Sequence, residues 1–164
     1  NGTTNHILTR IEAGASFAEA LRAAQFAGFA ESDPSRDLNG LDAADKIALL
    51  AWLAFGVDPT ALAVQTRGLP GDLDSAVRAA TARGERLRLV ATASLRDGIV
   101  RASVAPESLS RTDALATAID EENLGQGESH SAGAITLSGR GAGGAATASA
   151  LLADLIHLFQ PSPV

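Results

Sequence analysis

Residues 29–46 read FAESDPSRDLNGLDAADK, an acidic loop that leads into a helix. A proline stiffens the loop, and an Asn-Gly pair turns it before the helix begins. Asp42 and Lys46 are one helical turn apart, so their side chains lie on the same face. Residues 47–55 are apolar nearly all round, which predicts that the helix is buried. A carboxylate and an ammonium therefore head a buried helix and face a loop rich in acids, which is typical of a cleft.

This segment has two other interpretations besides a cleft. Aspartate followed by lysine four residues later is also the favourable order for an ordinary solvent-exposed pair. Ser35, Asp37 and Asn39–Gly40 have the spacing of a calcium-binding loop, but such a loop begins with Asp and ends with a bidentate Glu. Here Ser35 and Lys46 hold those two places, and an ammonium would repel the ion. We therefore predict no metal site, and the exposed pair stays as the alternative.

The composition is that of one globular domain of 164 residues, with 46% hydrophobic and 20% charged residues. A net charge of −6 argues against nucleic acid or an anionic membrane as partner. The longest apolar run, residues 47–57, is well short of the roughly 20 residues that a spanning helix needs. A chain without cysteine fits a cytoplasmic location. Because methionine is also absent, we expect this chain to be a piece of a longer polypeptide.

Helices are expected throughout the first half of the chain. Ser16 and Glu19 form the pattern of a capping box. Asp58–Pro59 combines an N-cap residue with proline at the first helical position, which predicts another helix start. The expected helices cover residues 4–13, 17–28, 41–55, a stretch from Asp58–Pro59 to just before Gly68, and residues 73–83.

The hydrophobic period then changes to that of strands. Apolar and polar residues alternate over residues 87–95, Asp97–Gly98 is a hairpin turn, and residues 99–104 return as the partner strand, ended by Pro106. Beyond it we expect a short helix at 113–119, an exposed loop at 120–131, a strand at 134–137, a tight turn at 139–144 and a helix at 147–159. These elements predict an α+β fold, with a mixed, largely antiparallel sheet covered by helices.

The glycines at 139, 141 and 144 match the dinucleotide-binding fingerprint in local form. That fingerprint also needs a βαβ unit and an acidic residue about 20 positions later, and the expected elements supply neither. A tight turn is one alternative. We prefer a third interpretation, in which the bare backbone lets a cofactor held by another domain approach closely. The three histidines are interpreted as structural or exposed, and no serine lies in a nucleophile-elbow pattern.

Three motifs, taken together, resemble the homoserine dehydrogenase family. Residues 1–8, NGTTNHIL, resemble its Asn-Gly-Thr-Thr-Asn-Tyr-Ile-Leu. Residues 29–46 resemble its Gly-Tyr-x-Glu-x-Asp-Pro and Asp-x-x-Gly-x-Asp-x-Ala-x-Lys, and residues 139–150 resemble its Gly-x-Gly-Ala-Gly and Thr-Ala-Ser-Ala. They occur in the family's order and cover almost the whole chain.

The resemblance implies reversible hydride transfer between L-homoserine and NAD or NADP, with L-aspartate 4-semialdehyde as the oxidised partner, in threonine and methionine biosynthesis. It implies an acid–base role for Lys46, which we expect to be protonated because Asp42 is adjacent. Substrate contacts are implied for Glu31, Asp42, Asp37 and Thr3. Cofactor contacts are implied for Asn1, Gly2, Gly141 and Gly143, the last from the Gly-Ala-Gly motif. A homodimer through the sheet is implied as well.

Some features depart from the family pattern. Phe29 stands in place of the usual tyrosine, and Asp113 in place of a histidine. The N-terminal nucleotide-binding domain is not part of residues 1–164, which we interpret as the catalytic, substrate-binding domain alone. We therefore expect the cofactor to be bound mainly by another domain and this chain to be inactive by itself. The alternatives are a non-catalytic dimerising remnant and a different two-domain dehydrogenase.

Overall fold

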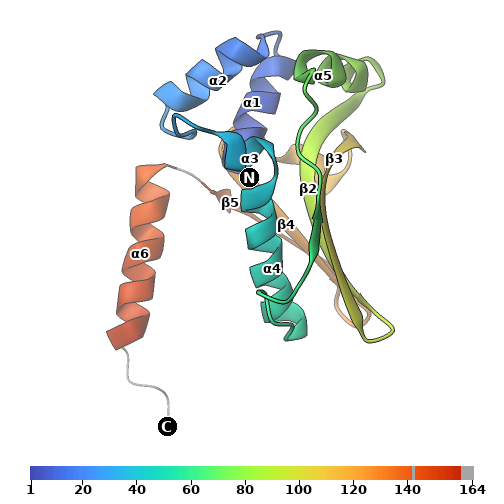
Figure 1. Cartoon of the computed structure of the whole chain (residues 1–164), viewed down its shortest axis with the longest axis vertical. Coiled ribbons are helices and arrows are strands. Elements are labelled where there is room, and N and C mark those ends of the chain that lie inside the picture. Colours follow the sequence, from blue (N-terminus) through green and yellow to red (C-terminus); the bar gives the residue numbers. More distant parts are fainter. Residues whose placement is uncertain (142, 160–164) are drawn as a thin grey trace.

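The computed structural model describes residues 1–141 and 143–159, so Ala142 of the glycine motif and residues 160–164 lie outside it. Helices dominate the first half of the chain and strands the second, which confirms the predicted α+β class (Figure 1). The elements are α1 (Gly2–Glu12), α2 (Phe17–Phe26), α3 (Ser35–Leu38), α4 (Leu41–Phe55), β1 (Val64–Thr66), α5 (Leu73–Ala82), β2 (Glu85–Arg96), β3 (Ile99–Ser110), a 3₁₀ turn at Ala114–Thr117, β4 (Glu122–Ser129), β5 (Gly133–Arg140) and α6 (Gly144–Phe159).

The main sheet has three strands in the order β1-β3-β2. β2 and β3 pair antiparallel along their whole length, whereas β1 pairs parallel with β3. Asp97 and Gly98 have φ of 52° and 75°, and two positive values in succession are those of a type I′ hairpin turn. β4 and β5 form a separate antiparallel ribbon. The predicted hairpin and the mixed, largely antiparallel pairing are therefore confirmed.

Two clusters of buried side chains hold these elements together. One lies among α1, α2, α5 and the start of β2, at one end of the molecule (Figure 1). The other lies between α4 and the β2–β3 hairpin, where Ala43, Ala44 and Ile47 pack on Leu89 and Val104. Small alanines on the inner face of α4 allow the helix to lie close to the sheet. This second cluster fixes the position of the helix that carries Lys46.

The prediction that α4 is buried is wrong for the second half of the helix. Ala48 and Ala51 continue its inner face, but the bulky apolar residues lie outside. Leu49, Leu50, Trp52, Leu53 and Phe55 are each at least 37% exposed. A helix against one small sheet has a single packed face, so the remaining apolar residues of α4 form an uncovered surface. α6 likewise buries none of its residues.

Asp58–Pro59 does not begin a helix. The Asp58 carboxylate accepts hydrogen bonds from the backbone nitrogen and the hydroxyl of Thr60, both at 2.8 Å, and so closes a turn. The chain then becomes β1, because pairing of Val64–Thr66 with β3 outweighs the local helix signal.

Two other strand predictions were wrong. Pro106 does not end β3, which continues to Ser110. Val104 is the last residue of β3 that pairs with β1, so Pro106 has a strand neighbour on one side only, where proline is tolerated. Residues 120–131 are not a loop. Most of them form β4, whose glycines and polar side chains hide the strand signal and whose ladder with β5 supplies the order.

Candidate functional site

Four of the residues singled out from the sequence form one polar network. Lys46 Nζ lies 2.8 Å from Asp42 Oδ2. The side-chain nitrogen of Asn1 donates to Asp42 Oδ2 at 2.5 Å and to Asp37 Oδ1 at 2.6 Å. An ordinary surface pair one turn apart has no such partner from a distant segment. The network therefore joins the start of α1, the short α3 and the head of α4 at one place.

The network sits at the edge of the protein rather than inside it. The side chains of Lys46 and Asp42 are 50% and 32% exposed. Partial burial alone would raise the pKa of Asp42, but the hydrogen bond and charge of Lys46, with the hydrogen bond from Asn1, outweigh it and lower the pKa below its usual value. Asp42 is therefore ionised at neutral pH, and Lys46 stays within reach of a molecule from solvent.

The head of α4 is fixed by a close backbone contact. A Cβ added at Gly68 would lie 2.6 Å from the Cα of Asn39, so only glycine fits against the turn between α3 and α4. The backbone nitrogen of Leu69 donates to the carbonyl of Leu38 at 2.8 Å. Gly68 and Leu69, which precede α5, thus fix the turn between α3 and α4, and this turn positions Asp42 beside Asn1.

The loop that carries Glu31 is tied to α1 and α2. The Thr3 hydroxyl donates to the Phe29 carbonyl at 2.6 Å, and the Gln25 side chain donates to the Glu31 carbonyl at 3.1 Å. The Glu31 side chain itself is exposed and has no hydrogen bond within the described part of the chain. Thr3 therefore holds the backbone of the loop at Phe29, while the carboxylate of Glu31 is free to bind a ligand. Gln25 was not singled out from the sequence, because an amide on a helix carries no signal of its distant contact.

The glycines at 141 and 143 differ in their surroundings: Gly141 is packed against a neighbouring side chain, whereas Gly143 is more open. Gly141 donates its backbone N–H to Glu121 at 3.0 Å, and a side chain there would overlap that of Asn123. A side chain at Gly141 would therefore force the Asn123 side chain to move, which favours glycine here without any cofactor contact. Gly143 has φ of +94° and faces Phe29 of the acidic loop, with 3.9 Å between an added Cβ and Phe29 Cε1. Gly143 thus lies beside the loop, whereas Gly141 lies against the ribbon.

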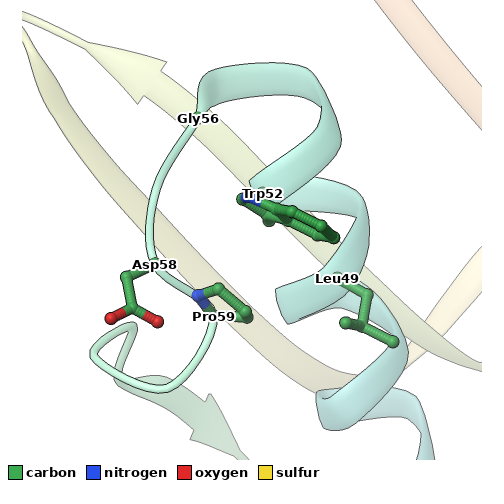
Figure 2. A pocket seen from close by; sticks show the side chains of 5 residues that line it. All are labelled: Leu49, Trp52, Gly56, Asp58 and Pro59. Carbon is green, nitrogen blue, oxygen red and sulfur yellow. The ribbon is translucent and has the colours of Figure 1, made fainter. Parts of the chain in front are cut away.

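A separate pocket lies at the far end of α4 (Figure 2). Trp52 and Leu49 project from the helix beside Pro59 of the following turn. None of the residues predicted from the sequence as site residues lines it, and its one carboxylate, Asp58, is taken by Thr60. We therefore assign no chemistry to this pocket.

Neither a metal-binding cluster nor a membrane-spanning helix is found in the described residues. Among them, no group of three or more His, Asp or Glu side chains could hold a metal ion. None of the helices in the described ranges combines the length and the apolar character that crossing a bilayer requires.

The fold and network define a mixed α+β domain with a lysine–carboxylate pair at the head of a helix. A family model described as homoserine dehydrogenase matches residues 1–156. The chain therefore belongs to the homoserine dehydrogenase family, as the sequence motifs predicted.

Curated and solved relatives agree. The NAD(+)-dependent homoserine dehydrogenase of Pseudomonas canavaninivorans is 38% identical over 98% of this chain, and the homoserine dehydrogenase of Methanocaldococcus jannaschii is 36% identical over 98%. The crystal structure of S. aureus homoserine dehydrogenase at pH 6.5 matches the whole chain with a TM-score of 0.83 at 33% identity, covering 42% of that protein. This chain spans 46% of the length of each of the two curated relatives.

Proposed function

We propose that this chain is the catalytic, substrate-binding domain of an oxidoreductase that interconverts L-homoserine and L-aspartate 4-semialdehyde with NAD or NADP, in threonine and methionine biosynthesis. The observation that carries the proposal is the network of Lys46, Asp42, Asn1 and Asp37. In it Lys46 contacts Asp42 directly and is linked to Asp37 through Asn1, which supports a proton-carrying role in a chain that belongs to the homoserine dehydrogenase family.

Lys46 is the proposed acid–base residue. Oxidation of an alcohol requires a group that takes the hydroxyl proton as the C–H hydride leaves, and reduction requires the same group to return it. The Asp42 carboxylate lies 2.8 Å from Lys46 Nζ, and the ammonium group of Lys46 donates a proton to the aldehyde oxygen during reduction. In the oxidising direction, the neutral amine accepts the hydroxyl proton. NAD or NADP, when bound, supplies the hydride acceptor.

The carboxylates of Glu31, Asp37 and Asp42 are the proposed contacts for the homoserine ammonium and hydroxyl groups. Asp37 and Asp42 share the Asn1 amide, which keeps the two like charges in a fixed arrangement. Glu31 is free to bind, on a loop whose backbone is held by Thr3 and Gln25. Thr3 therefore contributes to substrate binding by holding this loop.

Glu31→Gln tests the substrate assignment. A charge-assisted hydrogen bond to the substrate ammonium is worth about 1.5–3 kcal/mol, so we expect KM for L-homoserine to rise about 10- to 100-fold with a smaller change in kcat. Steady-state kinetics of the complete polypeptide measures both. Asp33→Asn is the matched control, because it removes a charge from the same loop but keeps the acceptor for the Ser35 nitrogen. Equal KM values for the two variants would contradict the assignment.

The bare backbone at the start of α6 fits the approach of a cofactor. Among the described residues, a Cβ added at Gly144 would meet nothing within 4 Å, and one added at Gly143 would meet Phe29 alone. Asn1 and Gly2 lie at the start of α1, and Gly141 lies against Asn123. These residues offer too few contacts to hold a dinucleotide. We propose that they border the nicotinamide and that a domain outside this chain binds the rest of the NAD or NADP.

We also propose that the chain forms a homodimer through its strands. β4 and β5 make a two-stranded ribbon, which is marginally stable alone in water, and β5 exposes Ile135 and Leu137 at 56% and 73%. A second copy would cover these side chains.

We expect purified residues 1–164 to sediment as a dimer and to show no homoserine-dependent reduction of NAD or NADP. A monomer with Leu137 exposed would contradict the dimer, and turnover would contradict the need for another domain.

A further inference from the structure

His6 is a buried side chain that the proposed reaction leaves unused. It projects from α1, four residues before Arg10 on the same face, and is 4% exposed. Its ring centroid lies 5.1 Å from that of Phe29, with the planes inclined at 58°. Its Nδ1 lies 3.5 Å from Asp120 Oδ1, and neither ring nitrogen has a hydrogen bond within the described residues.

A buried histidine ring without hydrogen bonds is energetically unfavourable. Burying a polar group without a partner is unfavourable, and most buried polar atoms in proteins are hydrogen-bonded. The contact that His6 does make is with the Phe29 ring, at a centroid separation within the range of favourable aromatic pairs. The His6 ring therefore contributes through its contact with the acidic loop rather than through hydrogen bonds.

Phe29 is the point where that loop meets the rest of the site. Its carbonyl accepts from Thr3 at 2.6 Å, its ring lies against His6 on one side, and its Cε1 is the atom nearest to a Cβ added at Gly143. Glu31, the free carboxylate, follows two residues later. A shift of the Phe29 ring would therefore move the Glu31 loop relative to both α1 and the glycine segment.

We propose that His6 is a positioning residue, whose ring stacks on Phe29 and holds the loop of Glu31 in the shape that binds the substrate ammonium. The inference rests on the proposed function, because it assigns His6 to the binding step of that reaction. His6 touches neither substrate nor cofactor. It acts through Phe29.

The charge state of the ring follows from its surroundings. Burial lowers the pKa of His6, and so does Arg10 on the same helix, whereas Asp120 and Glu121, just before β4, oppose them. His6 is therefore neutral in the folded protein at neutral pH. The pKa of His6 is lower in the folded protein than in the unfolded chain. The stability that neutral His6 contributes is therefore fully present above the unfolded pKa and is lost as pH falls through the folded pKa.

Substitutions at His6 separate the ring from its charge. We expect His6→Leu, which fills space without a ring, to raise KM for L-homoserine about 3- to 10-fold and to change kcat less than about 2-fold. His6→Phe keeps an aromatic ring and should restore the KM of the unchanged protein. His130→Ala is the matched control, because His130 lies exposed in the turn between β4 and β5.

Hydrogen–deuterium exchange gives a second readout that needs no activity. In the complete polypeptide, we expect exchange over residues 27–33 to be about 10-fold faster in His6→Leu and normal in His6→Phe, with α5 unchanged in both. Unchanged exchange in His6→Leu, or equal effects of leucine and phenylalanine, would overturn the proposal. If the unchanged protein does not oxidise L-homoserine, the proposed function fails, and exchange alone decides whether His6 holds the loop.

Discussion

Lys46→Ala is expected to lower kcat for homoserine-dependent reduction of NAD or NADP by about 100-fold or more, the range over which positioned acids and bases act. Lys46 is the one side-chain cation in the network with Asp42, Asn1 and Asp37 within the described residues, so no neighbouring side chain replaces its proton. KM should change less, because the carboxylates that bind the ammonium group are retained. Initial rates of the complete polypeptide, with saturating cofactor, give both constants.

Two further variants sharpen this result. Lys46→Arg keeps a positive charge beside Asp42 but cannot release its proton, so we expect a loss close to that of alanine. Arg36→Ala is the matched control, since Arg36 pairs with Asp45 at 2.6 Å and both side chains are 68% exposed. Near-normal kcat in Lys46→Ala would show that another group carries the proton.

Glu12→Gln is expected to lower the free energy of unfolding by about 3–5 kcal/mol, the usual cost of breaking a buried ion pair. Glu12 Oε1 lies 2.7 Å from Arg88 Nη1, and its Oε2 lies 3.4 Å from Arg86 Nε. Burial lowers the pKa of Arg88, and Glu12 is the charge that opposes this. Without the carboxylate, two guanidinium groups remain together, one of them almost fully buried.

Urea denaturation measures this change, provided that the slope with denaturant stays the same. Glu85→Gln is the matched control, because Glu85 pairs with Arg83 at 2.8 Å where the arginine side chain is 54% exposed. Exposed pairs contribute about 0–1 kcal/mol. A similar small loss in Glu12→Gln would contradict the role of Glu12 as the link between α1 and β2.

Local patterns predicted most of the elements, because their causes lie within a few residues. The capping box at Ser16 and Glu19 is present, and the Asp97–Gly98 turn closes the hairpin. The burial of Arg88 could not be predicted from a local pattern. Alternation in β2 placed it on the polar face, yet it is 2% exposed, because Glu12 and the carbonyl of Ala118 cover it from distant segments.

In the candidate site, too, local contacts could be predicted and long-range contacts could not. Helical spacing alone predicted that Asp42 and Lys46 would be adjacent, and the 2.8 Å contact confirms it. The contacts of Asn1 with Asp37 and Asp42 span 36 and 41 positions, which no local pattern reaches. The exposed side of α4 could not be predicted either, since apolar residues on a helix do not reveal whether this chain or another surface covers them.

Oxidation of L-homoserine by the complete polypeptide tests the central claim most directly. The measurement is the initial rate of NAD or NADP reduction with L-homoserine, beside the same rate with a four-carbon hydroxy acid that lacks the amino group. The account predicts turnover of L-homoserine and a rate at least about 100-fold lower without the ammonium, because the carboxylates of the site would lose their partner. Equal rates with both compounds, or no turnover of L-homoserine with either cofactor, would contradict it.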